Sequence, residues 1–323
     1  MCNGVDKTLP ELSADDLAST RLRLAVAGHA AVESGSTLSA GDHMPKHADV
    51  VLVGKIPIFD YDRRASGWLR QLNECKSNGG RIVIDYTDHH LGFDSPVKPF
   101  YLSALSLADS CIVPHHALAE ALTTVQPALS SKIRVIEDLI EYPFRDPRQS
   151  AQNGSTGGVL WFGHGTNFEF LACLCTMWPE RAPRDLFIVS SEEVHNFIRS
   201  GQLTAAVELD VHFHLWSQQA LQEVAATASL TVIPSSFESR KQFASSNRLV
   251  TSLALGLPVV ATPLPSYLEF AEHFCEFGSD AADEIFTDPQ QALPRVLSFQ
   301  HQYAERFSLE KIAHDWCTAI NES

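Results

Sequence analysis

Basic residues are scarce in this sequence. Lysine and arginine together number 24, against 39 aspartate and glutamate residues, which gives a formal net charge of −15 at pH 7. A surface with this excess of negative charge repels the phosphates of nucleic acids and the headgroups of anionic membranes. We therefore expect no nucleic-acid partner.

Long hydrophobic runs are absent too. No stretch approaches the roughly 18 consecutive apolar residues of a membrane-spanning helix, so we expect no transmembrane segment. Residues 1–16, MCNGVDKTLPELSADD, lack the basic and apolar regions of a signal peptide. On these grounds we expect a cytoplasmic protein.

The seven cysteines form no framework of pairs. They are scattered and mostly lie in apolar surroundings, as reduced thiols do. Only Cys173 and Cys175 are close together, and they fall in an apolar segment of helical character with no second pair at zinc spacing. We expect thiols in the core and no metal site.

Several nucleotide-binding and hydrolase motifs are missing as well. The sequence contains no Gly-x-Gly-x-x-Gly, no Walker glycine–lysine motif and no Gly-x-Ser-x-Gly. These absences disfavour dinucleotide oxidoreductases, P-loop enzymes and α/β-hydrolases. No internal repeat of 20 to 50 residues is visible, which sets aside solenoids and propellers.

The chain does contain a sustained alternation of short β-branched runs with amphipathic segments of helical length, which is typical of parallel sheets. At 323 residues it is longer than one core usually supports. Pro, Gly, Ser and Asn interrupt the pattern at 145–158, which predicts an interdomain linker. Strands are expected at 21–28, 48–54, 81–86, 110–114 and 133–138, and again at 158–163, 185–190, 206–215, 230–234 and 257–262.

We therefore expect two Rossmann-like domains, at 1–150 and 151–300, followed by a C-terminal helix within 301–323. In open parallel sheets, ligands bind at the carboxyl ends of the strands. The candidate site residues are accordingly those that directly follow each expected strand.

The most informative segment is SSNRLVTSLALGLPVVATPLPSY, at 245–267. It predicts a helix that stops at Gly256, then a buried strand and a proline-bounded loop. Arg248 lies in the first helical turn, where the backbone N–H groups already favour an anion and a guanidinium adds a phosphate donor. This arrangement predicts a diphosphate site, and the alternative is that Arg248 merely pairs with a surface carboxylate.

The segment resembles the donor-domain hallmark of group 1 (family 4-like) GT-B glycosyltransferases. The matching residues are Ala254, Gly256, Pro258, Val259 and Val260, with LTVIP (230–234) ahead and Pro265, Ser266, Tyr267 and Glu269 behind. The resemblance implies the α/β GT-B fold, in which two Rossmann-like domains with parallel sheets face each other across a cleft. The first domain takes the acceptor side, the second binds a nucleotide-sugar donor, and the final helix crosses back to the first.

By this resemblance, Arg248 contacts the donor diphosphate, while groups around Ser266 and Tyr267 approach the nucleotide or the sugar. Relatives usually carry a ribose-binding Glu five residues before the motif glycine, where this chain has Thr251. Glu269 and Glu238 are the candidate substitutes.

The resemblance also places a glycine-rich turn of the donor site at Gly163, His164 and Gly165. Glycines let the backbone approach phosphates, and Thr166 or Asn167 can cap the helix that follows. Family members commonly have Arg in place of His164. The alternative is a plain tight turn with an exposed imidazole.

In the first domain, a polar cluster follows the strand at 81–86. We take Asp88 and His89 as the catalytic candidates, since relatives carry a His or Asp near the sugar and acceptor at about this point. Lys55 and Asp85 are further candidates for binding the acceptor or a phosphate. The alternative is an Asx-type turn at Asp88 with solvated histidines.

The function implied by the resemblance is a metal-independent, hexosyltransferase-like enzyme of the kind that serves polysaccharide biosynthesis. It moves a sugar from a nucleotide-sugar, which is a substrate and not a cofactor, to a glycan, lipid-linked or small-molecule acceptor, with retention of configuration. Two alternatives stay open. One is a GT-B-like binding or partner subunit without activity, and the other is a sugar-nucleotide epimerase, which needs several carboxylates for acid–base work.

Overall fold

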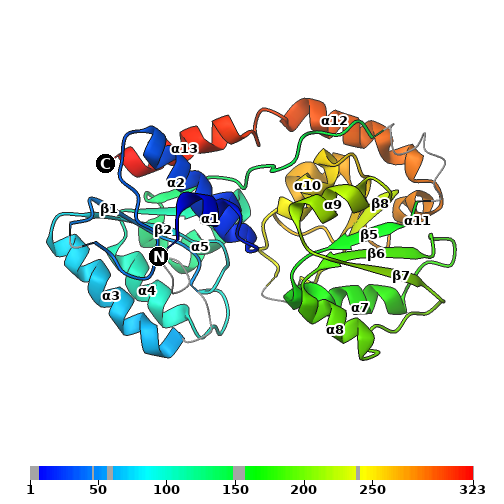
Figure 1. Cartoon of the computed structure of the whole chain (residues 1–323), viewed down its shortest axis with the longest axis horizontal. Coiled ribbons are helices and arrows are strands. Elements are labelled where there is room, and N and C mark those ends of the chain that lie inside the picture. Colours follow the sequence, from blue (N-terminus) through cyan, green and yellow to red (C-terminus); the bar gives the residue numbers. More distant parts are fainter. Residues whose placement is uncertain (1–6, 46, 57–60, 148–156, 238–240, 323) are drawn as a thin grey trace. The chain divides into compact units, whose positions relative to one another are not determined.

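A computed structural model of the chain describes residues 7–45, 47–56, 61–147, 157–237 and 241–322. It divides into two compact units, each built on one parallel sheet (Figure 1). Unit 1 comprises residues 1–139, 243–245 and 306–323, and unit 2 comprises residues 140–242 and 246–305. Neither unit is a single continuous stretch of chain.

Unit 1 contains a four-stranded parallel sheet in the order β1-β2-β3-β4. Its strands are β1 (Val50–Val53), β2 (Arg81–Asp85), β3 (Ser110–Val113) and β4 (Ile133–Val135). Its helices are α1 (Leu9–Ser13), a π-helical turn (Thr20–Leu24), α2 (Ala25–Glu33), α3 (Tyr61–Ser77), α4 (Lys98–Leu107), α5 (His116–Val125) and α13 (Leu309–Asn321).

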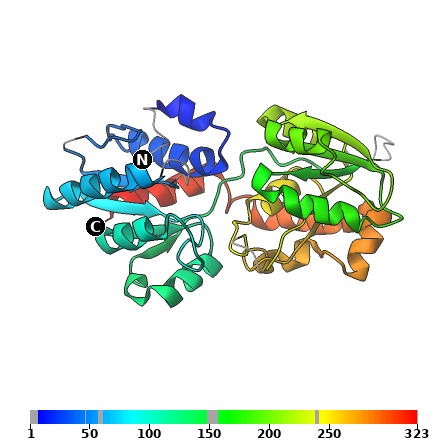
Figure 2. The same ribbon diagram turned by 90° about the horizontal axis from the view of Figure 1, so that it is seen from below.

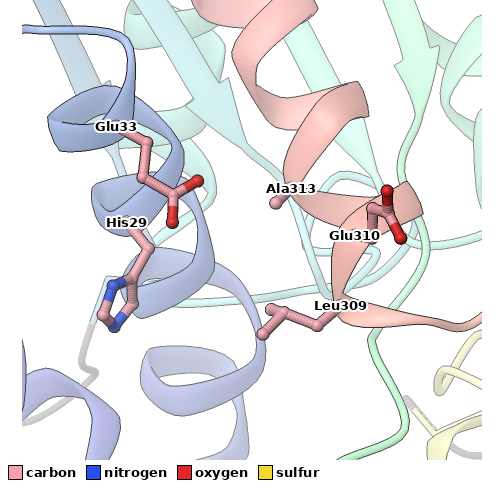
Figure 3. Close-up of a pocket in the computed structure, with 5 residues that line it drawn as sticks. All are labelled: His29, Glu33, Leu309, Glu310 and Ala313. Carbon is pink, nitrogen blue, oxygen red and sulfur yellow. The ribbon is translucent and has the colours of Figure 1, made fainter.

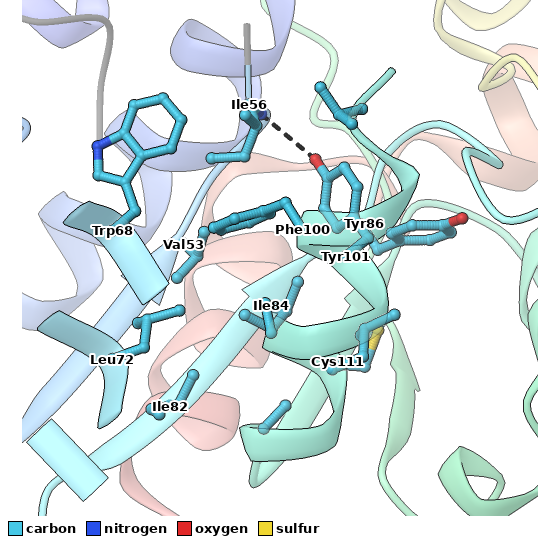
Figure 4. Packing of buried hydrophobic residues seen from close by; sticks show 14 of the residues in the cluster. Val53, Ile56, Trp68, Leu72, Ile82, Ile84, Tyr86, Phe100, Tyr101 and Cys111 are labelled. Atoms are coloured by element: carbon cyan, nitrogen blue, oxygen red, sulfur yellow. Dashed lines mark hydrogen bonds between the residues drawn. The ribbon is translucent and has the colours of Figure 1, made fainter. Parts of the chain in front are cut away.

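Side chains of alternate residues in the central strands point to opposite faces of the sheet and pack into two separate cores in unit 1. Ile82 and Ile84 point into a core shared with α3, α4 and α5, whereas Val83 joins a second core formed with α2 and α13. In Figure 1, α3 and α4 lie on one face of the sheet and α2 and α13 on the other. The first core also buries a polar bond, in which the backbone N–H of Ile56 donates to Oη of Tyr101 at 3.3 Å (Figure 4). A sheet covered on both faces explains its nearly continuous apolar strands.

The strand expected at 21–28 is wrong, because the structure places the π-helical turn and the start of α2 there. The alternating leucines suggested a strand, yet Leu22, Val26 and Ala30 are four residues apart and all three are buried. That spacing puts them on one helical face, which packs on the sheet. The first unit consequently has one strand fewer than expected among its described residues.

Unit 2 contains a six-stranded parallel sheet in the order β10-β9-β8-β5-β6-β7. Its strands are β5 (Val159–Phe162), β6 (Asp185–Ser190), β7 (Asp210–Leu215), β8 (Leu230–Ile233), β9 (Val259–Ala261) and β10 (Cys275–Glu276). Its helices are α7 (Phe168–Thr176), α8 (Glu192–Arg199), α9 (Gln218–Ala225), α10 (Asn247–Ala254), α11 (Asp280–Thr287) and α12 (Leu293–Tyr303). All of the strands expected in this half of the sequence are present: β6 has the expected bounds, the other four are shorter, and β10 was not expected.

The unit boundaries differ from the expected domain limits. Unit 1 gives way to unit 2 after Leu139, and residues 148–156 of the expected linker lie outside the described residues. Arg145 already belongs to unit 2, since its N–H donates to the carbonyl of Ala254 at 2.9 Å and its own carbonyl accepts from Nε2 of Gln300 at 2.9 Å. The chain returns to unit 1 at Arg306, whose guanidinium pairs with both carboxylate oxygens of Glu137, at 2.7 and 2.6 Å.

The C-terminal helix expected within 301–323 is α13, and the first residues of that range, 301–303, belong to the end of α12. Helix α12 ends at Tyr303, and α13 begins after Ser308, whose hydroxyl accepts a hydrogen bond from the N–H of Lys311. Helix α13 lies beside α2 in unit 1, as Figure 2 shows in red and blue, and Trp316 is 0% exposed in the core that they share. A pocket at the edge of this contact is lined by His29, Glu33, Leu309, Glu310 and Ala313, none of which is an expected site residue (Figure 3). In the part of the chain that the structure describes, no helix is both long and apolar enough to cross a membrane.

Candidate functional site

Arg248 lies at the amino-terminal end of α10 in unit 2. The helix is anchored by Leu249, Val250 and Leu253, which are buried, and its first turn contains no acidic residue. Nη1 of Arg248 is itself buried and has no hydrogen-bond partner among the described residues. Within the same residues, no carboxylate pairs with this guanidinium, so the alternative of a surface ion pair gains no support.

Gly163 brings the carboxyl end of β5 against Arg248. A Cβ placed on Gly163 would lie 3.6 Å from Nη1 of Arg248 and 3.4 Å from Nδ2 of Asn167. Gly163 and Arg248 are 85 positions apart in the sequence and therefore meet at the same edge of the sheet only through the fold. This is the juxtaposition that a diphosphate site requires.

His164 and Gly165 shape the turn after β5. The imidazole Nδ1 of His164 accepts from the N–H of Thr166 at 3.2 Å and so caps the 3₁₀ turn Gly165–Asn167. Gly165 is buried, and a Cβ there would collide with the carboxylate of Glu193. A larger residue at position 165 would have to displace the end of the Glu193 side chain, while His164 remains exposed.

Lys241 is a further candidate for this site that the sequence did not suggest. Its ammonium donates to Oγ1 of Thr166 at 3.1 Å, which places a second cation at the glycine turn. A lysine in the loop between β8 and α10 was the available signal. The sequence alone does not show that this lysine lies near the glycine turn, because Thr166 follows β5 and Lys241 follows β8.

Buried polar atoms gather around this edge of the sheet in unit 2. Those with no hydrogen-bond partner in the described part of the chain include Trp161 Nε1, Ser191 Oγ, Ser235 Oγ and Tyr267 Oη. Ser191, Ser235 and Tyr267 follow β6, β8 and β9, so they lie beyond carboxyl ends of strands. A buried polar atom without a partner costs free energy, which marks this edge as the candidate ligand site.

Tyr267 is fully buried beside Arg248. Burial raises the pKa of its hydroxyl, and the nearby guanidinium charge opposes that rise. The two side chains are close enough to interact electrostatically, although the hydroxyl makes no hydrogen bond of standard geometry. Tyr267 is therefore a neutral neighbour that leaves the charge of Arg248 uncompensated.

The remaining donor-side candidates differ in accessibility. Ser266 is buried, Glu269 is exposed, and Glu238 lies outside the described residues. Thr251 is buried, and its Oγ1 donates to Oδ1 of Asn247 at 3.3 Å. The hydroxyl of Thr251 is thus hydrogen-bonded within its own helix. By the resemblance, position 251 is the one at which a ribose-binding Glu is usual.

In unit 1, Lys55 and Asp88 meet at the carboxyl edge of the four-stranded sheet. Strands β1 and β2 pair in parallel with Val53 opposite Ile84, so the loops that follow them are neighbours. Nζ of Lys55 lies 2.6 Å from Oδ2 of Asp88. Both side chains remain partly exposed and can reach a ligand.

His89 is the more buried of the two catalytic candidates, at 7% exposure. Burial, together with the charge of Lys98, lowers its pKa, so its imidazole is neutral at pH 7. Its Nδ1 and the hydroxyl of Thr87 are buried and lack hydrogen-bond partners in the described residues. A neutral imidazole with a free nitrogen can accept a proton from a hydroxyl or donate a hydrogen bond to it.

The structure corrects the candidate role of Asp85. This residue is 1% exposed, and its carboxylate receives two hydrogen bonds from Nε of Arg23, at 2.8 and 3.0 Å. Arg23 also donates to Oδ1 of Asp138 at 3.0 Å and packs over the ring of Trp316. Asp85 therefore stabilises the interior of unit 1 and does not face a ligand.

Within the ranges that the structure describes, no three His, Cys, Asp or Glu side chains are placed to hold a metal ion together. Cys173 is exposed and Cys175 is buried, and burial raises the thiol pKa of Cys175 to about 12. A thiol with that pKa is protonated at neutral pH.

No model of a known protein family matches the sequence, and no curated protein matches it either. Solved structures do match. The structure of TarM has a TM-score of 0.55 at 13% identity, over 76% of this chain and 51% of that one. An E. coli trehalose-6-phosphate structure bound with UDP-2-fluoro glucose has a TM-score of 0.54 at 10% identity, over 79% of this chain and 71% of that one. The pneumococcal O-GlcNAc transferase GtfA, in complex with UDP and GlcNAc, has a TM-score of 0.50 at 12% identity, over 78% of this chain and 54% of that one.

This chain thus spans about half the length of the TarM and GtfA chains. At such low identities the likeness shows the fold and leaves the activity open. Two units with parallel sheets, matched by these structures, confirm the fold predicted from the sequence: the chain has an α/β GT-B fold built from two Rossmann-like units.

Proposed function

We propose that the chain is a glycosyltransferase that takes a sugar from a nucleotide-sugar donor bound by unit 2. The observation that carries the proposal is the buried Nη1 of Arg248, which lies without a partner against Gly163 at the carboxyl edge of the sheet. Two neighbours of the same fold contain ligands of this class, namely UDP with GlcNAc and UDP-2-fluoro glucose.

The proposed chemistry depends on stabilising a diphosphate leaving group. Negative charge develops on the diphosphate as the bond to the sugar breaks, and preorganised positive groups lower the energy of that state. Arg248, the amino-terminal end of α10 and Lys241 supply such groups. We propose on this basis that transfer needs no metal ion and no cofactor beyond the donor itself.

Asp88 and His89 are the residues that we propose to act on the acceptor side, in unit 1. The neutral imidazole of His89 can hold or accept the proton of an acceptor hydroxyl, and Asp88 is fixed by Lys55. We propose retention of anomeric configuration as the outcome, following the resemblance of the 245–267 segment.

A second candidate function is a binding or partner subunit without transfer activity. The state of Thr251 favours it, because this buried side chain is hydrogen-bonded to Asn247 and offers no carboxylate to a ribose. Donor binding without turnover is the behaviour expected of such a protein.

One experiment separates these functions. Calorimetry with UDP, GDP and ADP identifies the nucleotide, and release of that nucleotide from a panel of its sugar conjugates is then measured with and without a mixture of glycan acceptors. Binding together with release supports transfer, and binding without release supports the subunit. Conversion of the donor sugar at C2, followed by NMR, indicates an epimerase, and a protein that binds none of the nucleotides contradicts the proposal.

A further inference from the structure

Phe243 belongs to unit 1 although the chain on both sides of it belongs to unit 2. Only residues 243–245 of this loop are part of unit 1, and α10 begins directly afterwards at Asn247. The side chain of Phe243 packs against the core of unit 1 that includes Tyr86 and Leu91. The loop leading into the Arg248 helix thus contributes a side chain to the unit that holds His89.

His115 fixes the backbone of Phe243. Its Nδ1 accepts from the N–H of Leu118 at 3.2 Å and thereby caps α5. In a neutral imidazole one nitrogen accepts and the other carries the proton, so Nε2 is the donor to the carbonyl of Phe243, at 3.1 Å. Because His115 is only 2% exposed, these two bonds hold the ring and the Phe243 carbonyl together.

The ring of Phe243 in turn covers His89. The two ring centroids are 5.0 Å apart at an interplanar angle of 75°, an edge-to-face arrangement. Tyr86 packs edge-on against the same imidazole, at 6.4 Å. The charged groups that face this region are Lys98, whose charge acts on His89, and the Lys55–Asp88 pair in the adjoining loops.

We propose that Phe243 is a positioning residue of the His89 site, anchored through its carbonyl by His115. Its ring forms one wall of the site, excludes water from the imidazole and sets its orientation. The role of Phe243 in catalysis rests on the proposed function, whereas its contacts with His89 and His115 do not.

The proposal is tested on the ligand-free protein by NMR titration of the histidine side chains. Replacing Phe243 with Ala admits water to His89, so its pKa rises by about half a unit toward the ordinary value. Phe243→Tyr keeps the ring and retains the wild-type pKa, while Phe243→Leu gives an intermediate value. The matched control is Phe237→Ala, an exposed phenylalanine of the same loop, which leaves His89 unchanged.

An unchanged His89 pKa in folded Phe243→Ala overturns the proposal. If that variant does not fold, Phe243→Leu decides in its place, and a wild-type His89 titration in the leucine variant has the same meaning. Circular dichroism establishes folding in each case.

His115→Asn tests the anchor separately. Asparagine is a good helix N-cap, so α5 is preserved, but the side chain is too short to reach the Phe243 carbonyl. We expect the His89 pKa to rise in this variant as it does in Phe243→Ala, and no rise contradicts the role given to His115. Calorimetry with UDP, GDP and ADP on the wild type, Phe243→Ala and His115→Asn separates the two hypotheses: if none of the three proteins binds any of these nucleotides, the proposed function is contradicted and the His89 result still stands.

Discussion

At the scale of single residues, the proposed donor site depends on a cation, Arg248, that has no carboxylate partner among the described residues. Nη1 of Arg248 is buried against the end of β5, and its hydroxyl neighbour, Tyr267, is neutral. A guanidinium whose Nη1 is buried and has no anion beside it is unfavourable in the ligand-free protein. A bound diphosphate would relieve that cost.

We therefore expect Arg248→Ala to weaken binding of the cognate nucleotide by about 1.5 to 3 kcal/mol, roughly ten- to a hundredfold, through loss of a charge-assisted contact. Isothermal calorimetry measures the change. Arg181→Ala, an exposed arginine of the same unit, is the matched control and leaves the affinity unchanged. Equal affinity in wild type and Arg248→Ala would remove Arg248 from the site.

Gly163→Ala tests whether nucleotide binding requires the absence of a side chain at this turn. The new methyl group meets its neighbours at 3.4 Å or more, which is ordinary contact, so the melting temperature changes little. The methyl group does occupy the space beside Nη1 of Arg248, and we expect nucleotide affinity to fall by about tenfold. A variant that binds as tightly as wild type shows that the phosphates do not approach Gly163.

Residues at strand ends could be located from the sequence, since the order of strand, glycine turn and helix is local. Arg248 and Gly163 were recognised in this way, and the structure brings them together. The partners of Asp85 could not be recognised, because Arg23 is 62 positions away and lies in a segment read as a strand. Lys241 and Phe243 were missed for the same reason: their contacts are long-range.

At the scale of secondary structure, the error at 21–28 shows how an apolar helix can resemble a strand. Alternation of Leu22, Leu24 and Val26 fits a period of two, and Leu22, Val26 and Ala30 fit a helical face equally well. The deciding factor is tertiary: α13 packs beside α2, and Arg23 is buried with Asp85 and Asp138. A period count over a short window does not contain that information.

Helix α13 allows a test at this scale. Trp316 is fully buried, and the guanidinium of Arg23 lies 5.3 Å from its ring centroid. Trp316→Ala removes both the packing and the cover over a buried ion pair, so we expect unfolding free energy to fall by about 3 to 5 kcal/mol. Chemical denaturation followed by circular dichroism measures this loss.

The same variant retains the residues of the proposed donor site, all of which lie in unit 2. We therefore expect nucleotide affinity to be kept under conditions in which Trp316→Ala is folded. Trp216→Ala, a half-buried tryptophan of unit 2, is the comparison for the stability loss. A loss in Trp316→Ala no larger than that of an exposed substitution would show that α13 contributes little to unit 1.

At the scale of the whole molecule, metal independence follows from the proposed use of Arg248, Lys241 and the α10 terminus in place of a divalent cation. We expect nucleotide-sugar turnover to survive dialysis against EDTA. The sequence contains one Asp-x-Asp triplet, Asp60–Tyr61–Asp62, of which Asp60 lies outside the described residues. Activity lost on chelation and restored with manganese would contradict the expectation, and Asp60→Asn with Asp62→Asn would then identify the ligands.

The fold class and nine of the ten expected strands were predictable, because buried parallel strands between amphipathic helices leave a strong pattern in the sequence. The membership of the units was harder to predict. Residues 140–147 pack with unit 2 through Arg145, and residues 243–245 belong to unit 1 through Phe243. Such assignments depend on contacts between distant segments, which local periodicity does not encode.

The discontinuity of unit 1 has a consequence for its biosynthesis. One face of its sheet is closed by α2 and α13, and α13 (Leu309–Asn321) is among the last of the described residues to leave the ribosome. Unit 2 is complete once residue 305 has been made. The unit that is translated first therefore finishes folding second. Until α13 has been made, one apolar face of its sheet and the Arg23–Asp85 pair are not covered by this helix. Nascent chains stalled before residue 309 are accordingly expected to expose this face to chaperones, whereas chains stalled after residue 321 and clear of the exit tunnel are not.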